Sequence, residues 1–135
     1  MHDPERPPLD MKIKRLAQVS YPVSDVDRSV AFFETTLGLK LALRPHAHMA
    51  FFDAGGASIF LERADDVSQA SVLYLACDDV AVATAELERR GVEIVYPPHR
   101  ITEQPGYDLW MSFFKDPDGH MLALSMEAPK GWRPG

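Results

Sequence analysis

The segment 23–41, VSDVDRSVAFFETTLGLKL, contains the strongest local folding signals in the chain. Either Ser24 or Asp25 can cap a helix at its start, and apolar residues then recur at helical spacing as far as Leu37. Gly38 supplies the stop, because glycine readily adopts the left-handed conformation that ends many helices. The segment therefore predicts a helix at 26–37 that is preceded and followed by strands.

A second segment, 75–94 (LACDDVAVATAELERRGVEI), repeats the same order of features. Asp79 corresponds to Asp25 and Gly91 corresponds to Gly38, at offsets of 54 and 53 residues. A period near 50 residues indicates duplication of one supersecondary unit. The second helix is expected at 80–90.

Predicted strands surround each helix in the same order. In the first half we expect strands at 13–23, 39–44, 48–53 and 57–63. In the second half we expect strands at 71–77, 92–96, 109–114 and 120–126. Each β-α-β-β-β unit is too small to bury a face of its own sheet, so two units must share one core. The expected organisation is a flexible leader at 1–12, a single domain at 13–127 with module one at 13–64 and module two at 70–127, and a tail at 128–135. Trp132 in the tail can dock on a neighbouring surface.

Composition limits the possible classes of function. The chain has 135 residues, of which 46% are hydrophobic and 25% charged, as expected for one globular domain. A net charge of -6 argues against nucleic acid and anionic membrane as partners. No apolar run is long enough to span a bilayer, and residues 1–10 lack the apolar core of a secretory signal. Cys77 is the single cysteine and cannot form an internal disulfide, so a cytoplasmic location is expected.

Both repeated segments, together with FFKDPDGHMLAL at 113–124, resemble the vicinal oxygen chelate superfamily. That superfamily groups glyoxalase I, methylmalonyl-CoA epimerase, extradiol dioxygenases, and the bleomycin and fosfomycin resistance proteins. The resemblance implies an α+β fold in which two paired β-α-β-β-β modules form a curled sheet around a cleft. It also implies a homodimer, with modules paired within one chain or between chains. The DPDG sequence at 116–119 itself predicts a tight turn between the last two strands.

The same resemblance implies where metal-dependent members place their four ligands. Those positions fall on Gln18, on Phe60 (or Glu62, which faces the same side), on Val72 and on Ala123. Phenylalanine, valine and alanine offer no donor atom, and a divalent cation needs several oxygen, nitrogen or sulfur ligands. We therefore expect no metal at the family's site and no other cofactor.

Histidines elsewhere leave an alternative metal site open. His46 and His48 would share one face of a strand, and two imidazoles at that spacing can bind zinc, nickel or copper. Pro45 suggests a bend near an edge, where solvated histidines are common, so we favour an incidental pair. His120, beside the DPDG turn, is expected to be exposed.

A long loop is expected at 96–108, because this connection carries three prolines. If it folds over the cleft, His99 can act as a general base, or bind a substrate carboxylate with Arg100. Asp108 is the acidic partner that we assign to His99, and Glu103 is the alternative. A solvated loop is the competing interpretation.

Apolar side chains are expected to line the cleft. Strand alternation places Leu109, Met111 and Phe113 on one face, and Trp110, Ser112 and Phe114 on the other. The predicted ligand-binding residues are those that face the cleft: Gln18, Phe60, Glu62, Val72, Met111, Phe113 and Ala123. Such a pocket suits a small apolar or aromatic molecule, although the same side chains can simply fill a core.

Three functions remain open, and fold alone does not separate them. The first is a metal-independent protein that binds a small molecule, as antibiotic-sequestering members of the superfamily do. The second is a metal-dependent lyase, epimerase or dioxygenase that holds its metal through Gln18, Glu62 and a histidine. The third is a metal-free lyase or isomerase that uses His99. We favour the first.

Overall fold

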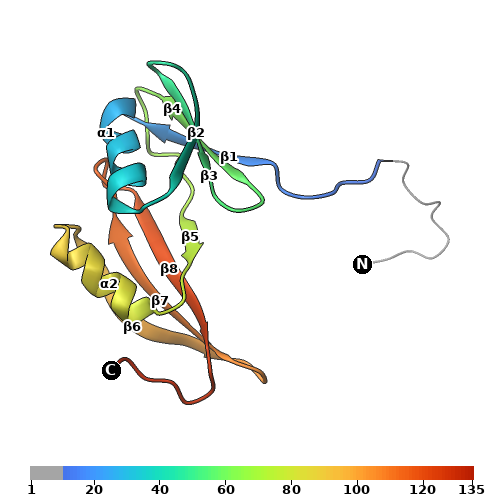
Figure 1. Ribbon diagram of the computed structural model, residues 1–135, viewed down its shortest axis with the longest axis vertical. Coiled ribbons are helices and arrows are strands. Elements are labelled where there is room, and N and C mark those ends of the chain that lie inside the picture. The colour runs from blue at the N-terminus through green and yellow to red at the C-terminus, as the bar shows by residue number, and fades with distance from the viewer. Residues whose placement is uncertain (1–10) are drawn as a thin grey trace.

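The computed structural model describes residues 11–135 and shows two β-α-β-β-β modules, each built on a four-stranded sheet (Figure 1). The strand order is β1-β4-β3-β2 in the first module and β5-β8-β7-β6 in the second. Strands β1 and β4 are parallel, as are β5 and β8, and the other neighbours are antiparallel. The predicted α+β fold of two repeated modules is therefore confirmed. None of the helices in this described part is both long enough and apolar enough to cross a membrane.

The elements follow one another in the same order in both modules. The first module contains β1 (Gln18–Val23), α1 (Val26–Ala31), the π-helix η1 (Phe32–Thr36), β2 (Lys40–His46), β3 (Met49–Asp53) and β4 (Ser58–Arg63). The second module contains β5 (Leu73–Ala76), α2 (Val80–Arg89), β6 (Ile94–Glu103), β7 (Asp108–Lys115) and β8 (Met121–Ala128).

Local sequence signals explain where both helices begin and end. The Asp25 carboxylate accepts from the backbone N–H of Arg28 at 3.1 Å, and Asp79 caps α2 in the same way. Gly38 and Gly91 follow the helices with φ angles of 73° and 82°, a conformation in which a side chain would be strained.

The two helices differ in their last turns. In the first module α1 continues into η1, where the Leu37 N–H donates to the Phe32 carbonyl at 3.0 Å. This bond spans five residues, whereas an α-helical bond spans four. In the second module α2 is α-helical throughout.

The prediction of a long loop at 96–108 is wrong. Most of these residues belong to β6, which pairs with β7, and the turn that follows is closed by the Gln104 N–H donating to the Tyr107 carbonyl at 2.8 Å. Pro97 and Pro98 lack an N–H, but within residues 11–135 β6 is an edge strand, which pairs on one side only and therefore tolerates prolines.

The predicted leader, 1–12, falls mostly on residues 1–10, which lie outside the described residues. Residues 11–17 precede β1 and belong to no helix or strand. The first strand begins at Gln18, five residues later than the sequence suggested.

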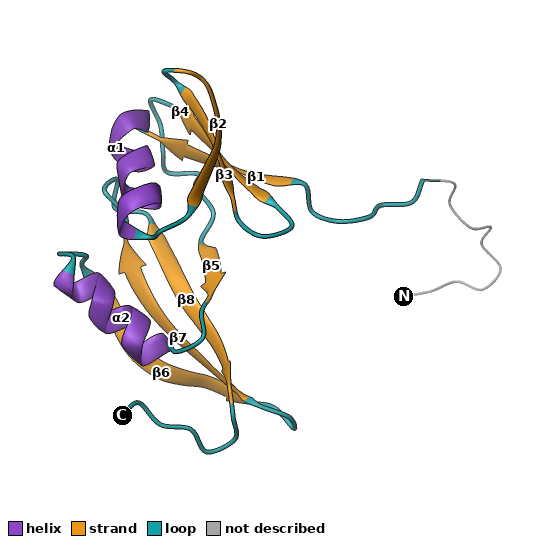
Figure 2. Cartoon of the chain, in the orientation of Figure 1, coloured by secondary structure: helices purple, strands orange, loops and turns teal. Residues whose placement is uncertain are grey.

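Each helix covers one face of its own sheet, and in Figure 2 both helices lie on the same side of the two sheets. In the first module Tyr21, Phe33 and Phe52 are fully buried between helix and sheet. The ring centroids of Phe33 lie 5.6 Å from Tyr21 and 5.5 Å from Phe52. Burial of aromatic side chains of this size supplies much of the free energy that holds a small module together.

The turn between β7 and β8 joins the second module to the first. We call residues 116–120 (DPDGH) the clasp. The Asp118 carboxylate accepts from the backbone N–H of Ser24 at 3.1 Å and from Arg28 Nη2 at 2.7 Å, and it also contacts the Ser24 hydroxyl. The Asp118 side chain is only 4% exposed, so its carboxylate is largely shielded from solvent, whereas the Arg28 side chain is 47% exposed. Gly119, with a φ angle of 82°, closes the predicted turn.

Two other members of the clasp bond to β1. The Tyr21 hydroxyl donates to Asp116 Oδ2 at 3.0 Å, and His120 Nε2 lies 3.0 Å from the Pro22 carbonyl. The Tyr21 and His120 rings meet edge to face with centroids 5.1 Å apart. His120 is half-buried, so the expectation that it is exposed is wrong: the clasp turns its ring toward the first module.

Further contacts between the modules lie beside the helices. The rings of Phe32 and Phe114 lie 6.5 Å apart, one from each module. Arg90, at the end of α2, donates to the carbonyls of Thr35 and Thr36 at 2.9 Å each. These carbonyls belong to η1, whose last turn leaves them without helical partners.

We predict that Asp118→Ala lowers the free energy of unfolding by about 2 kcal/mol, because charge-assisted bonds to Arg28 and to the Ser24 N–H are lost. Urea denaturation followed by circular dichroism measures this change. The matched control is Asp27→Ala, which removes an 86% exposed carboxylate paired with Arg44 and should cost less than about 1 kcal/mol. Equal losses in the two variants would show that the clasp does not hold the modules together.

Candidate functional site

Each sheet has a second face that is turned away from its helix, which we call its open face. Strand β7 shows the alternation clearly: Trp110, Ser112 and Phe114 are buried beneath the helix, whereas Met111 and Phe113 are half-exposed on the open face. The alternation predicted for this strand is therefore confirmed. Within the described residues no helix covers either open face.

A row of four residues crosses the open face of the first module. Leu43 of β2 is paired with Phe51 of β3, Phe51 with Phe60 of β4, and Phe60 with Ser20 of β1. The Phe51 and Phe60 rings are stacked, with centroids 4.7 Å apart and planes 7° apart. On the other side of Phe60 stands the small, exposed Ser20, so the second face of the Phe60 ring has no large neighbour in this row.

The equivalent row in the second module is also aromatic. Tyr96 of β6 is paired with Phe113 of β7, Phe113 with Ala123 of β8, and Ala123 with Tyr74 of β5. The Phe113 ring lies 6.3 Å from Tyr74 and 5.9 Å from Tyr96, edge to face in both pairs. His99 adds a fourth ring, 6.1 Å from Phe113 and inclined by 30° to it.

Ala123 lies beneath the aromatic side chains of its two neighbours. It is fully buried, although it lies on the open face, because Tyr74 and Phe113 come from the adjacent strands and meet above it. This is the position at which the family resemblance implies a metal-binding glutamate. A longer side chain here would have to displace one of the two rings.

The residues at the four implied ligand positions do not fit a metal ion. Gln18 is exposed at the start of β1, and Val72 is exposed just before β5. Phe60 and Ala123 offer only carbon atoms to the open face. Glu62 does lie on the same face as Phe60, but a single carboxylate and a single amide leave a divalent cation mostly hydrated.

The clasp brings together Asp116, Asp118 and His120, whose ligand atoms all lie within 4.8 Å of one another. Asp116 Oδ2 accepts from Tyr21, and its Oδ1 accepts from the backbone N–H groups of Asp118 and His120 at 2.9 and 2.8 Å. Burial raises the pKa of the Asp116 carboxyl, and the hydrogen bond from the His120 backbone N–H acts against that rise. The carboxylate oxygens and the ring nitrogen that could bind a metal instead form hydrogen bonds within the clasp or to the first module. The cluster therefore has a structural role.

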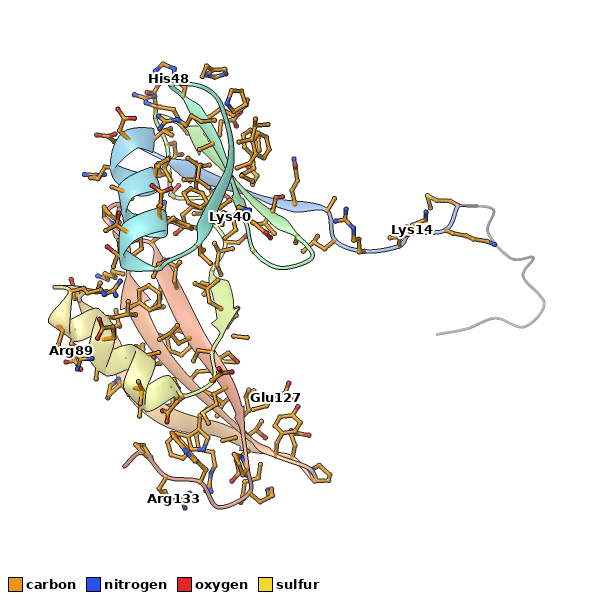
Figure 3. All side chains as sticks on the ribbon, in the orientation of Figure 1. Lys14, Lys40, His48, Arg89, Glu127 and Arg133 are labelled. Atoms are coloured by element: carbon orange, nitrogen blue, oxygen red, sulfur yellow. The ribbon has the colours of Figure 1, made fainter. Side chains whose placement is uncertain are left out.

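His46 and His48 lie at the hairpin between β2 and β3, at the end of the first module where Figure 3 labels His48. Both side chains are exposed, and His46 Nδ1 accepts from the His48 backbone N–H at 3.2 Å. The two rings have four nitrogens, and this bond engages one of them, which leaves three that could bind a metal ion.

The structure does not bring His99 and Asp108 together. His99 is exposed on β6 and paired with Met111, whereas Asp108 lies three residues earlier on β7, about 10 Å along the strand. The Asp108 side chain also points to the opposite face of the sheet. His99 Nδ1 lies 2.8 Å from the Pro97 carbonyl and donates to it in the tautomer that leaves Nε2 free as an acceptor.

Asp108 anchors the tail of the chain. Its carboxylate accepts from Lys130 Nζ at 2.6 Å and from the Gly131 N–H at 3.1 Å. These two hydrogen bonds lower the pKa of Asp108, and the bond from Lys130 has the larger effect. Next to this anchor Trp132 docks on Trp110 with ring centroids 5.1 Å apart, as the sequence led us to expect.

Cys77 has no features of a nucleophile. It is half-buried beyond the end of β5, and burial, together with Asp79 and Asp78, raises the pKa of its thiol. A thiol with a raised pKa is mostly protonated at neutral pH.

A cavity of about 760 Å³ lies between the modules, beside the second row. Its walls are β5 with the residues just before it, including Val72 and Tyr74, and the hairpin that joins β3 to β4, including Asp53 and Ser58. A cavity of this volume is large enough for a drug-sized molecule.

Sequence reasoning missed Phe51 and Tyr74 as members of the site. Tyr74 could have been found by alternation, since it lies two residues from Val72. Phe51 had no such signal, because no residue of β3 was expected to face the cleft. Their meeting with Phe60 and Phe113 depends on strand register, which the sequence alone does not give.

Comparison with known proteins places these features in context. A model of the Glyoxalase/Bleomycin resistance protein/Dioxygenase superfamily matches residues 15–124. Metallothiol transferase FosB of Lysinibacillus sphaericus (strain C3-41) is 25% identical over 115 residues, which cover 82% of this chain and 80% of that protein.

Solved structures are similar as well. The antibiotic binding protein TnmS3 from Streptomyces sp. CB03234 superposes with a TM-score of 0.70 at 27% identity, over 87% of this chain and 99% of that chain. The integron cassette protein VCH_CASS1 of V. Cholerae superposes with a TM-score of 0.72 at 26% identity, over 89% and 100% of the two chains.

We predict that Asp108→Asn loosens the tail and makes stability less dependent on pH. Because the pKa of Asp108 is lowered on folding, its carboxylate stabilises the native state above the unfolded pKa of about 4 and loses this effect as the pH falls further. The difference in urea midpoint between wild type and variant should therefore be largest above pH 5 and shrink below about pH 4. Tryptophan fluorescence follows the docking of Trp132.

Glu103→Gln is the control for this experiment, since Glu103 is 62% exposed and lies 3.5 Å from Arg100. It should leave both the midpoint and its pH dependence close to those of the wild type. A pH dependence that persists unchanged in Asp108→Asn would contradict the role of Asp108 as the anchor of the tail.

Proposed function

The chain belongs to the Glyoxalase/Bleomycin resistance protein/Dioxygenase superfamily, and from this premise we propose that it binds a small, flat aromatic or apolar molecule without a metal ion. The observation that carries the proposal is the aromatic row of the second module. At the position of the implied glutamate stands Ala123, and Tyr74 and Phe113 meet above it.

The exposure of these rings supports a role in binding. Tyr74 and Tyr96 are 57% and 53% exposed, so large aromatic surfaces face solvent in the single chain. Aromatic rings gain most from partners that meet them edge to face or stack with an offset. A planar ligand could contact Phe113 and its neighbours in the second module, or the free face of Phe60 above Ser20 in the first.

Charge favours a neutral or cationic ligand over an anion. The open face of the first module carries Glu62 and Asp53, both exposed. Glu62 forms no hydrogen bond or ion pair with any of residues 11–135, so its carboxylate remains available to a ligand. The net charge of -6 acts in the same direction at longer range.

The similarity to TnmS3, which is described as an antibiotic binding protein, also supports the proposal. We further propose that the protein works in the cytoplasm, because its single cysteine forms no internal disulfide. We also propose a homodimer, because a second copy could cover part of the open faces that the single chain leaves exposed. The second open function, a metal-dependent enzyme, would need ligands that Phe60, Val72 and Ala123 do not provide.

Proflavine, a planar cation whose fluorescence changes on binding, is a suitable probe. We predict saturable binding, and about threefold to tenfold weaker binding by Phe113→Ala, because an aromatic contact contributes about 0.5–1.5 kcal/mol. Tyr107→Ala removes a half-exposed ring outside both rows and should bind as the wild type does. If proflavine does not bind, and the anionic probe 8-anilinonaphthalene-1-sulfonate does not bind either, the proposed function is wrong.

We predict that the protein, purified without a metal-affinity step, retains no stoichiometric nickel, manganese, iron or zinc after incubation and desalting. Elemental analysis measures the metal content. Weak binding of nickel or zinc at the exposed histidines is tested with the variant His46→Ala, His48→Ala, which should abolish it. Stoichiometric metal in that variant would mean that the family's site or the clasp holds a metal, and it would contradict the metal-free proposal.

A further inference from the structure

A β-bulge in β6 brings His99 to the open face of the second module. Tyr96 is paired with Phe113 and His99 with Met111, so three steps along β6 correspond to two steps along β7. In a regular strand, residues three apart point to opposite faces, whereas the extra residue of a bulge places them on the same face. The His99 ring therefore lies beside the aromatic row, with its centroid 6.1 Å from Phe113 and 6.4 Å from Tyr96.

Pro97 and Pro98 occupy the bulge, between the two paired positions. Proline suits a bulge because it has no N–H to contribute to the ladder. The Pro97 carbonyl lies 2.8 Å from His99 Nδ1. Because a carbonyl oxygen can only accept, the proton of this hydrogen bond belongs to Nδ1. A neutral imidazole carries one such proton, so the lone pair is left on Nε2.

The lone pair of Nε2 is open to a ligand. His99 is exposed, and its ring forms no second hydrogen bond and no ion pair with any of residues 11–135. The lone pair lies in the plane of the imidazole, which is inclined by 30° to the Phe113 ring. A flat molecule stacked on Phe113 therefore carries the substituents of its edge in nearly the same plane as this lone pair.

The surroundings of His99 on the open face are mostly apolar. Its row continues across the sheet through Met111, Ser125 and Ala76, so Ser125 is the one polar neighbour among these paired residues. Glu127, paired with Leu109, stands one row further along β8. A single directed acceptor beside a broad apolar surface is the arrangement by which small-molecule sites fix the orientation of a ligand.

We propose that the ligand is a flat aromatic molecule with a hydroxyl group on its edge, and that this hydroxyl donates to His99 Nε2. The aromatic row supplies contact area, and His99 acts as the residue that determines specificity. This inference rests on the proposed function and narrows its ligand class to hydroxylated aromatics. A site that hydrogen-bonds a hydroxyl discriminates against the analogue in which that donor is blocked, since the acceptor then loses its partner.

A matched pair of ligands tests the inference. 2-Naphthol has the hydroxyl, and 2-methoxynaphthalene has the same ring system without the donor. Titrations that follow naphthalene fluorescence at pH 8, where an ordinary imidazole is neutral, give both dissociation constants. We expect His99→Phe, which keeps a ring but removes the acceptor, to lower the preference for 2-naphthol about threefold to tenfold.

Two further variants make the comparison specific. His48→Phe is the same substitution at an exposed histidine of the first module, and it should keep the preference of the wild type. Glu127→Gln removes the nearby carboxylate and should keep it as well. A preference that is lost in Glu127→Gln, or that is unchanged in His99→Phe, overturns the inference.

Failure of the inference can be distinguished from failure of the proposed function. If both naphthalenes bind and His99→Phe leaves their ratio unchanged, a flat aromatic site exists but His99 does not select its ligand. If neither naphthalene binds, the inference fails, and the proflavine titration decides whether the proposed function fails with it.

Nuclear magnetic resonance provides a readout that does not depend on affinity. Long-range ¹⁵N–¹H correlation of the imidazole, assigned by its loss in His99→Phe, should show the proton on Nδ1 at pH 8. The Nε2 resonance should move when 2-naphthol is added and stay in place with 2-methoxynaphthalene. A proton on Nε2, or equal shifts with the two compounds, would contradict the inference.

Discussion

The arrangement of the two modules depends on the buried hydrogen bond between the Tyr21 hydroxyl and the Asp116 carboxylate. Burial raises the pKa of the Tyr21 phenol, so the phenol keeps its proton and remains a donor. Two backbone N–H groups of the clasp donate to the other oxygen of this carboxylate, Asp116 Oδ1. A buried charge is tolerated only when it is satisfied in this way, and this requirement fixes the clasp against β1 in one orientation.

The consequence reaches the open faces. The clasp, which is the turn between β7 and β8, is bonded to the start of α1. Both helices lie on the same side of the sheets, and both open faces remain uncovered by helices (Figure 2). The equivalent rows on these faces differ in where their small residue stands. Ser20 occupies the β1 position in the first module and Ala123 the β8 position in the second. Apart from Phe51 and Phe113, which lie on the equivalent strands β3 and β7, the aromatic rings therefore fall on different strands in the two halves. A duplicated scaffold thus presents two different surfaces to a ligand.

Local signals predicted the parts of the fold that local chemistry decides. Asp25 and Asp79 cap the helices as expected, and the alternation of β7 was correct. A strand was expected at 92–96, but the continuation of β6 to Glu103 was missed. Two prolines indicate a loop unless the strand is known to lie at an edge, and sheet order is not a local property. The pairing of Asp108 with Lys130 was not predicted for a similar reason: the two residues are 22 positions apart in the chain, and local patterns do not reveal such a contact. For the site, the identities of Phe60, Phe113 and Ala123 were available from the sequence, but the meeting of Tyr74 and Phe113 over Ala123 required the register of three strands.

The π-helix η1 accounts for an irregularity in the sequence repeat. The two modules are offset by 54 residues at their helix caps but by 53 at the glycines that end the helices, so the first module has one residue more between these points. The five-residue bond from Leu37 to Phe32 holds that extra residue inside the helix. The extra residue is therefore accommodated without lengthening a loop, and both helices still deliver the chain to their sheets at equivalent points.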